Sequence, residues 1–246
     1  MLFFYSFHFH RKRRAYFIIC LCIIILIFAA TSIWKKDATE TALIKGNKHE
    51  KTIALTFNIS WGEEKVFSIL DVLKKHKVRA SFFVSGEWAE RHPQIVEAIT
   101  ENEHELGMLG YRYKNYLELD VNQVRKDILY ARQVFKKLGY EDIRYIRPPS
   151  GLFNKEIITL AESLGLEVIH WSINSEDWKS PGVAEIKKKM SKSSNGDIIL
   201  LHASDSAKQT AEVLDDFIPN MHKKGFSYTT ISALKNNMTS EEKLIE

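Results

Sequence analysis

Apolar residues are distributed along this chain in two different ways. Residues 15–34 form one continuous run without a charged side chain, which matches the roughly 20 residues that a helix needs to cross a bilayer. From residue 52 onward, short apolar runs typical of buried strands alternate with amphipathic helical segments. The pattern therefore predicts a membrane segment, a polar linker at residues 35–51 and one α/β domain.

The strand candidates are short and apolar, and they lie at residues 53–57, 79–84, 105–108, 143–146, 166–173, 197–202 and 227–231. Between them, apolar side chains recur at helical spacing, as at Val66, Ile69, Leu70 and Leu73 and again at Val124, Ile128, Phe135 and Leu138. Asp120 and Gln123 form a capping pair at one predicted helix start, and Asn154 is a candidate cap for another.

Alternating strands and helices imply a mainly parallel sheet with right-handed crossovers. We expect an α/β fold, a distorted (β/α) barrel of about seven parallel strands over residues 52–236, with an open doubly wound sheet as the alternative. In either fold a functional site forms at the carboxyl ends of the strands. Residues 237–246 are predicted to form a polar tail.

The apolar run has the flanks of a transmembrane helix. Residues 11–14 are all basic, and Tyr16 and Trp34 lie near the two ends of the run, where aromatic side chains meet the membrane interface. We expect residues 1–14 to be cytoplasmic and residues 15–34 to be a single-pass anchor in the cell membrane, with the domain outside the cytoplasm. Small residues at 29–32 leave an alternative, a signal segment whose cleavage secretes the domain.

Composition narrows the range of partners. The chain has 246 residues, is 45% hydrophobic and 27% charged, and has a net charge of +4, which is ordinary for a globular protein. No basic patch interleaved with aromatic residues occurs after the membrane segment, so we expect no nucleic-acid partner. The cysteines, Cys20 and Cys22, lie within the apolar run, so the exported part is expected to have no disulfide.

Five segments of distinctive composition fall near the expected strand ends, at residues 56–62, 109–113, 147–151, 171–178 and 200–202. Each alone has an ordinary structural explanation. The Arg147–Gly151 segment has the residues of a turn, and His202 could simply close an apolar strand. Asp177 and Trp178 could be loop and packing residues. Their order along the chain is more informative than any one of them.

Three phrases carry a family resemblance: LTFNISWG at residues 55–62, FFVSG at 82–86 and LLHASDSA at 200–207. With the other segments, they resemble the NodB-homology domain of polysaccharide deacetylases, carbohydrate esterase family 4, close to its sporulation-associated branch. The resemblance extends from about residue 52 to residue 234. It implies removal of N-acetyl groups from chitin or peptidoglycan, by a divalent metal, a carboxylate base and a histidine acid.

Half of that catalytic set is missing here. The resemblance places the general base at Asn58, and an amide cannot take up a proton at neutral pH. It places the metal ligands at Ile59, Leu109 and Tyr113. Two of these side chains have no donor atom, and a neutral phenol is a poor ligand. We therefore expect no metal cofactor, although the family uses one.

The other half is retained. The resemblance assigns Arg147 to orienting the base, His202 to the general acid and Asp177 to holding that histidine. The resemblance also assigns substrate contacts to Trp171, Trp178 and Pro148. It places Asn174 where family members often have an aspartate. His104, His170, Glu103 and Glu105 match no standard metal motif and are expected to be solvated surface residues.

Three functions remain open from the sequence. The first is a membrane-anchored envelope protein that binds cell-wall glycan (peptidoglycan or a chitin-like polymer) or another partner without hydrolysing amides. The second is an active N-deacetylase with altered, metal-free chemistry based on Asp177 and His202. The third is a structural or scaffolding role, in which the retained residues only pack.

Overall fold

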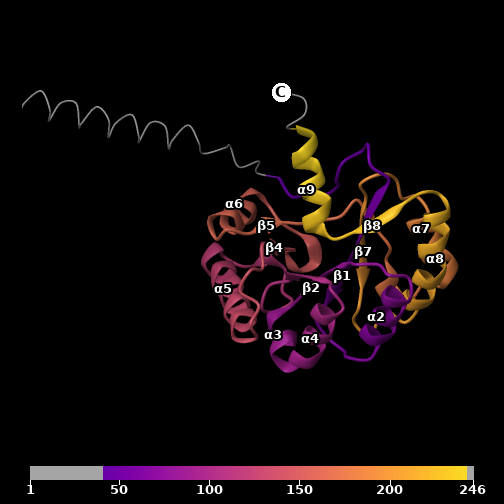
Figure 1. The fold of residues 1–246 in the computed structure, drawn as a ribbon. Coiled ribbons are helices and arrows are strands. Elements are labelled where there is room, and N and C mark those ends of the chain that lie inside the picture. Colours follow the sequence, from indigo (N-terminus) through magenta and orange to yellow (C-terminus); the bar gives the residue numbers. More distant parts are fainter. Residues whose placement is uncertain (1–40, 243–246) are drawn as a thin grey trace, which may run out of the picture. The chain divides into compact units, whose positions relative to one another are not determined.

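The computed structural model describes residues 41–242, with side chains to residue 237. The predicted membrane segment at residues 15–34 lies outside the described residues. Within residues 41–242, no helix has both the length and the apolar character to span a membrane. Figure 1 shows the described chain as strands surrounded by helices.

All pairings between the named strands are parallel, and β1 (Thr52–Ile59) is central. The order is β5-β4-β3-β2-β1-β7-β6, with β8 also paired to β1. The other strands are β2 (Ser81–Val84), β3 (Glu105–Met108), β4 (Tyr145–Ile146), β5 (Glu167–Val168), β6 (Ile173–Asn174), β7 (Ile198–His202) and β8 (Ser227–Thr229). This arrangement confirms a parallel α/β fold of the predicted class.

The two ends of this strand order, β5 and β6, are formed by one short stretch of chain. We predicted a single strand at 166–173, but the structure divides it into two two-residue strands. β5 pairs with β4, and β6 pairs with β7 on the far side of β1. Because residues 169–172 connect them directly, the sheet curls round into a partial barrel instead of staying open.

The helices lie outside the curled sheet. They are α2 (Lys65–Lys75), α3 (Gly86–Arg91), α4 (Pro93–Glu101), α5 (Val121–Lys137), α6 (Lys155–Ser163), α7 (Val183–Met190) and α8 (Thr210–Lys223). In Figure 1, α2, α7 and α8 gather at one side, and α3 to α6 gather at the other. The predicted capping box of Asp120 and Gln123 is confirmed at the start of α5, and Asn154 caps α6 by accepting from Ile157 N.

Strand alternation separates an outer core from an inner one. On β1, Ile53, Leu55, Phe57 and Ile59 belong to the large cluster that also contains the buried helix residues. Ala54 belongs to a second, smaller cluster with Phe83 and Leu109. Thr56 and Asn58 have the same parity as Ala54 and lie on this inner face. The polar residues of β1 therefore project into the barrel.

The described parts of the predicted linker and tail, residues 41–51 and 237–242, contain more structure than the sequence suggested. In the predicted linker, Leu43 bridges Ile169, and Lys45 forms an ion pair with Asp197 at 2.7 Å. At the other end, residues 237–242 of the predicted tail belong to the helix α9 (Ile231–Glu242). Glu105 anchors this helix, since its carboxylate accepts from the main-chain N–H groups of Ile231 and Ser232, where a helix lacks internal partners.

Candidate functional site

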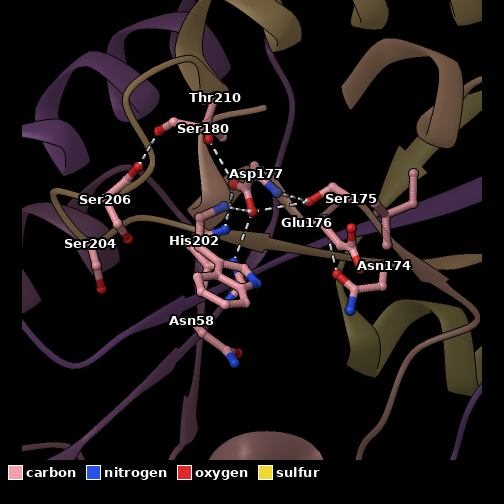
Figure 2. Close-up of polar contacts among 12 residues, drawn as sticks. Asn58, Asn174, Ser175, Glu176, Asp177, Ser180, His202, Ser204, Ser206 and Thr210 are labelled. Atoms are coloured by element: carbon pink, nitrogen blue, oxygen red, sulfur yellow. Dashed lines mark hydrogen bonds and ion pairs between the residues drawn. The ribbon is translucent and has the colours of Figure 1, made fainter. Parts of the chain in front are cut away.

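The candidate site lies where the inner faces of β1 and β7 end. Asn58 and His202 are Cα partners in the parallel pairing of these two strands, so their side chains leave the sheet on the same face. The loop after β6 brings Asp177 to the same place. Figure 2 shows His202 between Asp177 and Asn58.

Asp177 and His202 form a hydrogen-bonded pair, as the sequence predicted. His202 Nδ1 lies 2.8 Å from Asp177 Oδ1, and the carboxylate can only accept. The ring therefore carries its proton on Nδ1, with Nε2 on the opposite edge. The main-chain N–H of His202 also donates to Asp177 Oδ2 at 2.9 Å. These two contacts fix both the tautomer and the orientation of the imidazole.

Asp177 is fully buried and is surrounded by donors. Thr210 Oγ1 donates to Oδ2 at 2.6 Å, Ser175 Oγ donates to Oδ1 at 3.0 Å, and Trp178 N donates to Oδ1 at 3.0 Å. A buried carboxylate persists only when its oxygens are satisfied in this way. Asp177 thus ties His202 to Ser175, Trp178 and Thr210 through hydrogen bonds.

Arg147 is fully buried and follows directly after β4. Its Nη1 donates to Asn58 Oδ1 at 2.9 Å, and its Nη2 donates to Thr56 Oγ1 at 2.9 Å. The remaining bonds go to the main-chain oxygens of Ile169 and His170. Every acceptor is neutral, and burial lowers the pKa of Arg147 to about 9. In the described part of the chain, no carboxylate pairs with this guanidinium.

The three expected metal-ligand positions differ in their surroundings. Ile59 is fully buried in the outer core, whereas Leu109 is fully buried in the inner one. The Tyr113 side chain is 49% exposed. Two of the three have no lone pair to donate, so these residues do not fit a divalent metal. Across residues 41–242, no group of three histidine, cysteine or acidic side chains is placed to hold one.

The predicted substrate-contact residues differ in how they are held. Trp171 stacks on His170 at 3.8 Å between ring centroids and lies 5.4 Å from the Arg147 guanidinium carbon. Trp178 is 48% exposed and meets the His202 ring edge-on at 6.5 Å. Pro148 is buried. Asn174 is exposed, and its side chain accepts from Glu176 N.

The expectation of solvated surface residues was wrong for His104. His104 is only 6% exposed, its Nδ1 accepts from Ala80 N, and its Nε2 has no partner among the described residues. Burial lowers its pKa to about 4. Glu105 anchors α9, and His170 stacks on Trp171, with a pKa that burial lowers. Glu103 is exposed and forms an ion pair with Arg79.

Sequence reasoning missed the residues that hold the site together. Thr56 binds Arg147, and Thr210 binds Asp177 from 33 positions away. Asp205 accepts from the main-chain N–H groups of Glu64 and Lys65 and so fixes the start of α2. Asp127 does the same for the loop after β3, through Tyr111 N and Arg112 N. Thr56 and Asp205 lie inside recognised phrases, whereas nothing in the sequence marked Thr210 or Asp127.

Residues 45–169, about half of the chain, match the family model for polysaccharide deacetylases. The chain therefore belongs to the polysaccharide deacetylase family, the NodB-homology or carbohydrate esterase family 4 class.

Three curated relatives illustrate the range of the family. Bacillus subtilis PdaA, a peptidoglycan-N-acetylmuramic acid deacetylase, is 31% identical over 78% of this chain and 74% of PdaA. Bacillus subtilis YlxY, an uncharacterised protein, is 29% identical over 78% of this chain. Listeria monocytogenes PgdA, a peptidoglycan-N-acetylglucosamine deacetylase, is 33% identical over 76% of this chain. The aligned region spans only 60% of YlxY and 39% of PgdA.

Solved structures of the same class superpose well. BA3943 of Bacillus anthracis, a CE4 family pseudoenzyme, has a TM-score of 0.76 and 28% identity, covering 81% of this chain and 70% of BA3943. A BA3943 mutant with restored enzymatic activity also gives a TM-score of 0.76 at 28% identity, over 81% of this chain and 72% of the mutant. Bacillus subtilis PdaA gives 0.74 at 30% identity, over 80% of this chain and 86% of PdaA.

Proposed function

We propose that this protein is a non-hydrolytic member of its family that binds N-acetylated cell-wall glycan and lacks metal-dependent deacetylation. The observation that carries the proposal is the nature of the residues at the reactive positions. Asn58 cannot act as a base, and Ile59 and Leu109 are fully buried side chains without donor atoms. The likeness to BA3943, a CE4 family pseudoenzyme, supports the same conclusion.

The proposed ligand is peptidoglycan or a related polymer of N-acetylated sugars. Relatives named for peptidoglycan deacetylation support this choice. The exposed Trp178 ring beside His202 offers an aromatic face of the kind that sugar rings pack against. We further propose that residues 15–34 anchor the protein in the cell membrane, with the domain in the envelope and a role related to sporulation. The apolar run and the phrase at 200–207 support this placement.

Two measurements on the full-length protein in detergent test the proposal. Metal analysis after dialysis against zinc should give far less than one equivalent. A pull-down with purified peptidoglycan should retain the protein. Trp178→Ala should weaken retention, whereas Tyr130→Ala, which removes another exposed aromatic ring, on α5, should leave it unchanged. Stoichiometric zinc, or no retention at all, would contradict the proposal.

A second candidate is an enzyme with metal-free chemistry. The intact Asp177–His202 pair favours it, because the ring is oriented and its Nε2 remains available for proton transfer. This candidate predicts acetate release from N-acetylated oligosaccharides that survives a chelator and disappears in His202→Ala. A purely structural role predicts neither acetate release nor any loss of glycan retention in Trp178→Ala.

A further inference from the structure

The guanidinium group of Arg147 is fully buried in the barrel, and the four atoms that accept its hydrogen bonds are neutral. Thr56 adds no charge, because its hydroxyl donates to Ile199 O at 2.7 Å and offers Arg147 only a lone pair. A buried cation persists only when its surroundings stabilise the charge. Hydrogen bonds occupy the edge of the planar guanidinium, so its two faces remain for further stabilisation.

Two aromatic rings lie against this guanidinium. Its carbon Cζ is 4.1 Å from the centroid of the Phe83 ring and 5.4 Å from the centroid of the Trp171 ring. Both distances fall within the roughly 6 Å over which a cation is attracted to the face of an aromatic ring. Phe83 is the register partner of Asn58 on β2, whereas Trp171 belongs to the stretch between β5 and β6. Two separate segments of the barrel thus each supply one ring to Arg147.

Two glycines leave the space that these rings occupy. A Cβ atom at Gly107 on β3 would lie 2.7 Å from Cδ1 and Cε1 of Phe83, and one at Gly151 would lie 2.1 Å from Cη2 of Trp171. Both separations are far below the roughly 3.5–4.0 Å of a favourable carbon–carbon contact. The backbone of Gly107 does not itself require glycine, since its φ is not positive. At this position the lack of a side chain serves the packing of the Phe83 ring.

We propose that Phe83 and Trp171 are positioning residues, whose rings hold the charged guanidinium of Arg147 in place. Arg147 in turn fixes the amide of Asn58, through the 2.9 Å hydrogen bond from Nη1 to Oδ1. Trp171 therefore acts on the ligand through Arg147 and not through a sugar contact of its own, and the exposed Trp178 is left as the ring that meets the sugar. For its effect on ligand binding, this inference rests on the proposed glycan-binding function.

The test replaces each ring by leucine, which keeps apolar bulk and removes the aromatic face. Trp171→Leu and Phe83→Leu are compared with Phe82→Leu, each in the full-length protein in detergent. Phe82 is the neighbour of Phe83 on β2 and is equally buried, but it lies in the outer core. The readout is the set of side-chain NMR signals of the Asn58 amide and the Arg147 Nε–H group. Arg147→Lys, which keeps the charge and loses the fork of donors, shows how these amide signals move when Asn58 is released.

Trp171→Leu and Phe83→Leu should move the Asn58 amide signals in the same direction as Arg147→Lys does. Phe82→Leu should lower Tm and leave these signals in place. Trp171→Phe, which restores an aromatic face, should recover the wild-type signals. Because Trp171 is only partly buried, its two variants decide the question even if Phe83→Leu does not fold. Equal movement of the signals in Phe82→Leu and Trp171→Leu, or no recovery in Trp171→Phe, would overturn the inference.

Retention on purified peptidoglycan separates this inference from the proposed function. In Trp171→Leu the apparent affinity should fall on the order of tenfold, the effect of losing one desolvated cation–π contact, and Trp171→Phe should recover it. Lost retention with unchanged Asn58 signals would mean that Trp171 contacts the glycan directly, which overturns the inference while glycan binding stands. If the wild-type protein is not retained, but the Asn58 signals still follow the ring at position 171, the positioning role stands and the proposed function is wrong.

Discussion

Arg147 holds Asn58 through a hydrogen bond of 2.9 Å between Nη1 and Oδ1, and both side chains are buried inside the barrel. The family resemblance assigns Arg147 to orienting a catalytic carboxylate. In this chain the orienting bond is present, but the group that it orients is a neutral amide. The pair preserves the geometry of a base and its partner without the charge that makes a base.

This relationship predicts that Asn58→Asp stabilises the fold. The change replaces a neutral acceptor by a charged one, opposite a buried guanidinium that has no other counter-ion in the described part of the chain. Desolvation of the new carboxylate offsets part of the gain. We expect the free energy of unfolding to rise by about 1 kcal/mol, which is about 2–4 °C in Tm for a domain of this size.

The matched control is Asn174→Asp. It makes the same chemical change at an exposed asparagine that has no arginine contact, and it should leave Tm within about 1 °C of the wild-type value. Denaturant unfolding of all three proteins supplies the comparison. If Asn58→Asp is less stable than the control, the neutral acceptors already stabilise the charge of Arg147 sufficiently. That result would contradict our account.

A second prediction concerns the support of Asp177. Thr210→Val removes the 2.6 Å hydrogen bond to Oδ2 with little change of shape, and both residues are fully buried. The free energy of unfolding should fall by about 1–3 kcal/mol, because a buried carboxylate loses one of its donors. Thr159→Val removes an exposed bond to Lys155 O and should cost less than about 1 kcal/mol. Equal losses at both positions would show that the buried Thr210–Asp177 hydrogen bond contributes no more to the free energy of unfolding than an exposed one.

The burial of His104 should make the stability of the protein depend on pH. Burial lowers its pKa to about 4, whereas an unfolded chain titrates near 6.5. The unfolded state therefore binds the proton first, and stability is lost as the pH falls from about 6.5 toward 4. Between pH 7 and pH 5 this group should cost about 2 kcal/mol.

His104→Asn retains an acceptor for Ala80 N and cannot be protonated in this range. Its unfolding free energy should fall less steeply between pH 7 and pH 5 than that of the wild-type protein. The same substitution at the exposed His49 controls for the loss of a histidine. Identical slopes for the wild-type protein and His104→Asn would rule out this residue as a source of acid sensitivity.

Local sequence patterns predicted the elements well, because helix faces and caps depend on near neighbours. The faces at Val66 and Ile69 and the capping box at Asp120 were confirmed. The single strand predicted at 166–173 was wrong. The chain there forms two strands because its first part pairs with β4 and its last part pairs with β7. The docked part of the linker and the continuation of α9 also depend on distant partners, Asp197 and Glu105.

The candidate site was predictable only in part, for the same reason. The order of the phrases identified Arg147, Asp177 and His202, and the contacts of all three with their expected partners are confirmed. Thr210 could not be found, because nothing near it in the sequence marks it as a partner of Asp177. The position of Ile59 and Leu109 in two separate cores is likewise a property of the folded chain.

A variant with all four positions repaired tests the account as a whole. Asn58→Asp, Ile59→Asp, Leu109→His and Tyr113→His restore the base and ligand types of the family resemblance. Two of these changes put polar groups into apolar cores, so the variant should be less stable than the wild-type protein without metal. Zinc should raise its Tm and leave that of the wild-type protein unchanged. Single repairs should gain no metal binding.

Acetate release from N-acetylglucosamine oligomers, measured with and without a chelator, is the most direct test of the central claim. The account predicts no chelator-sensitive release by the unmodified protein. It predicts weak, zinc-dependent release by the fourfold variant and none by any single repair, because residues that act as one unit are strongly non-additive. Robust release by the unmodified protein that a chelator abolishes would contradict the claim that Asn58, Ile59, Leu109 and Tyr113 have ended metal-dependent deacetylation.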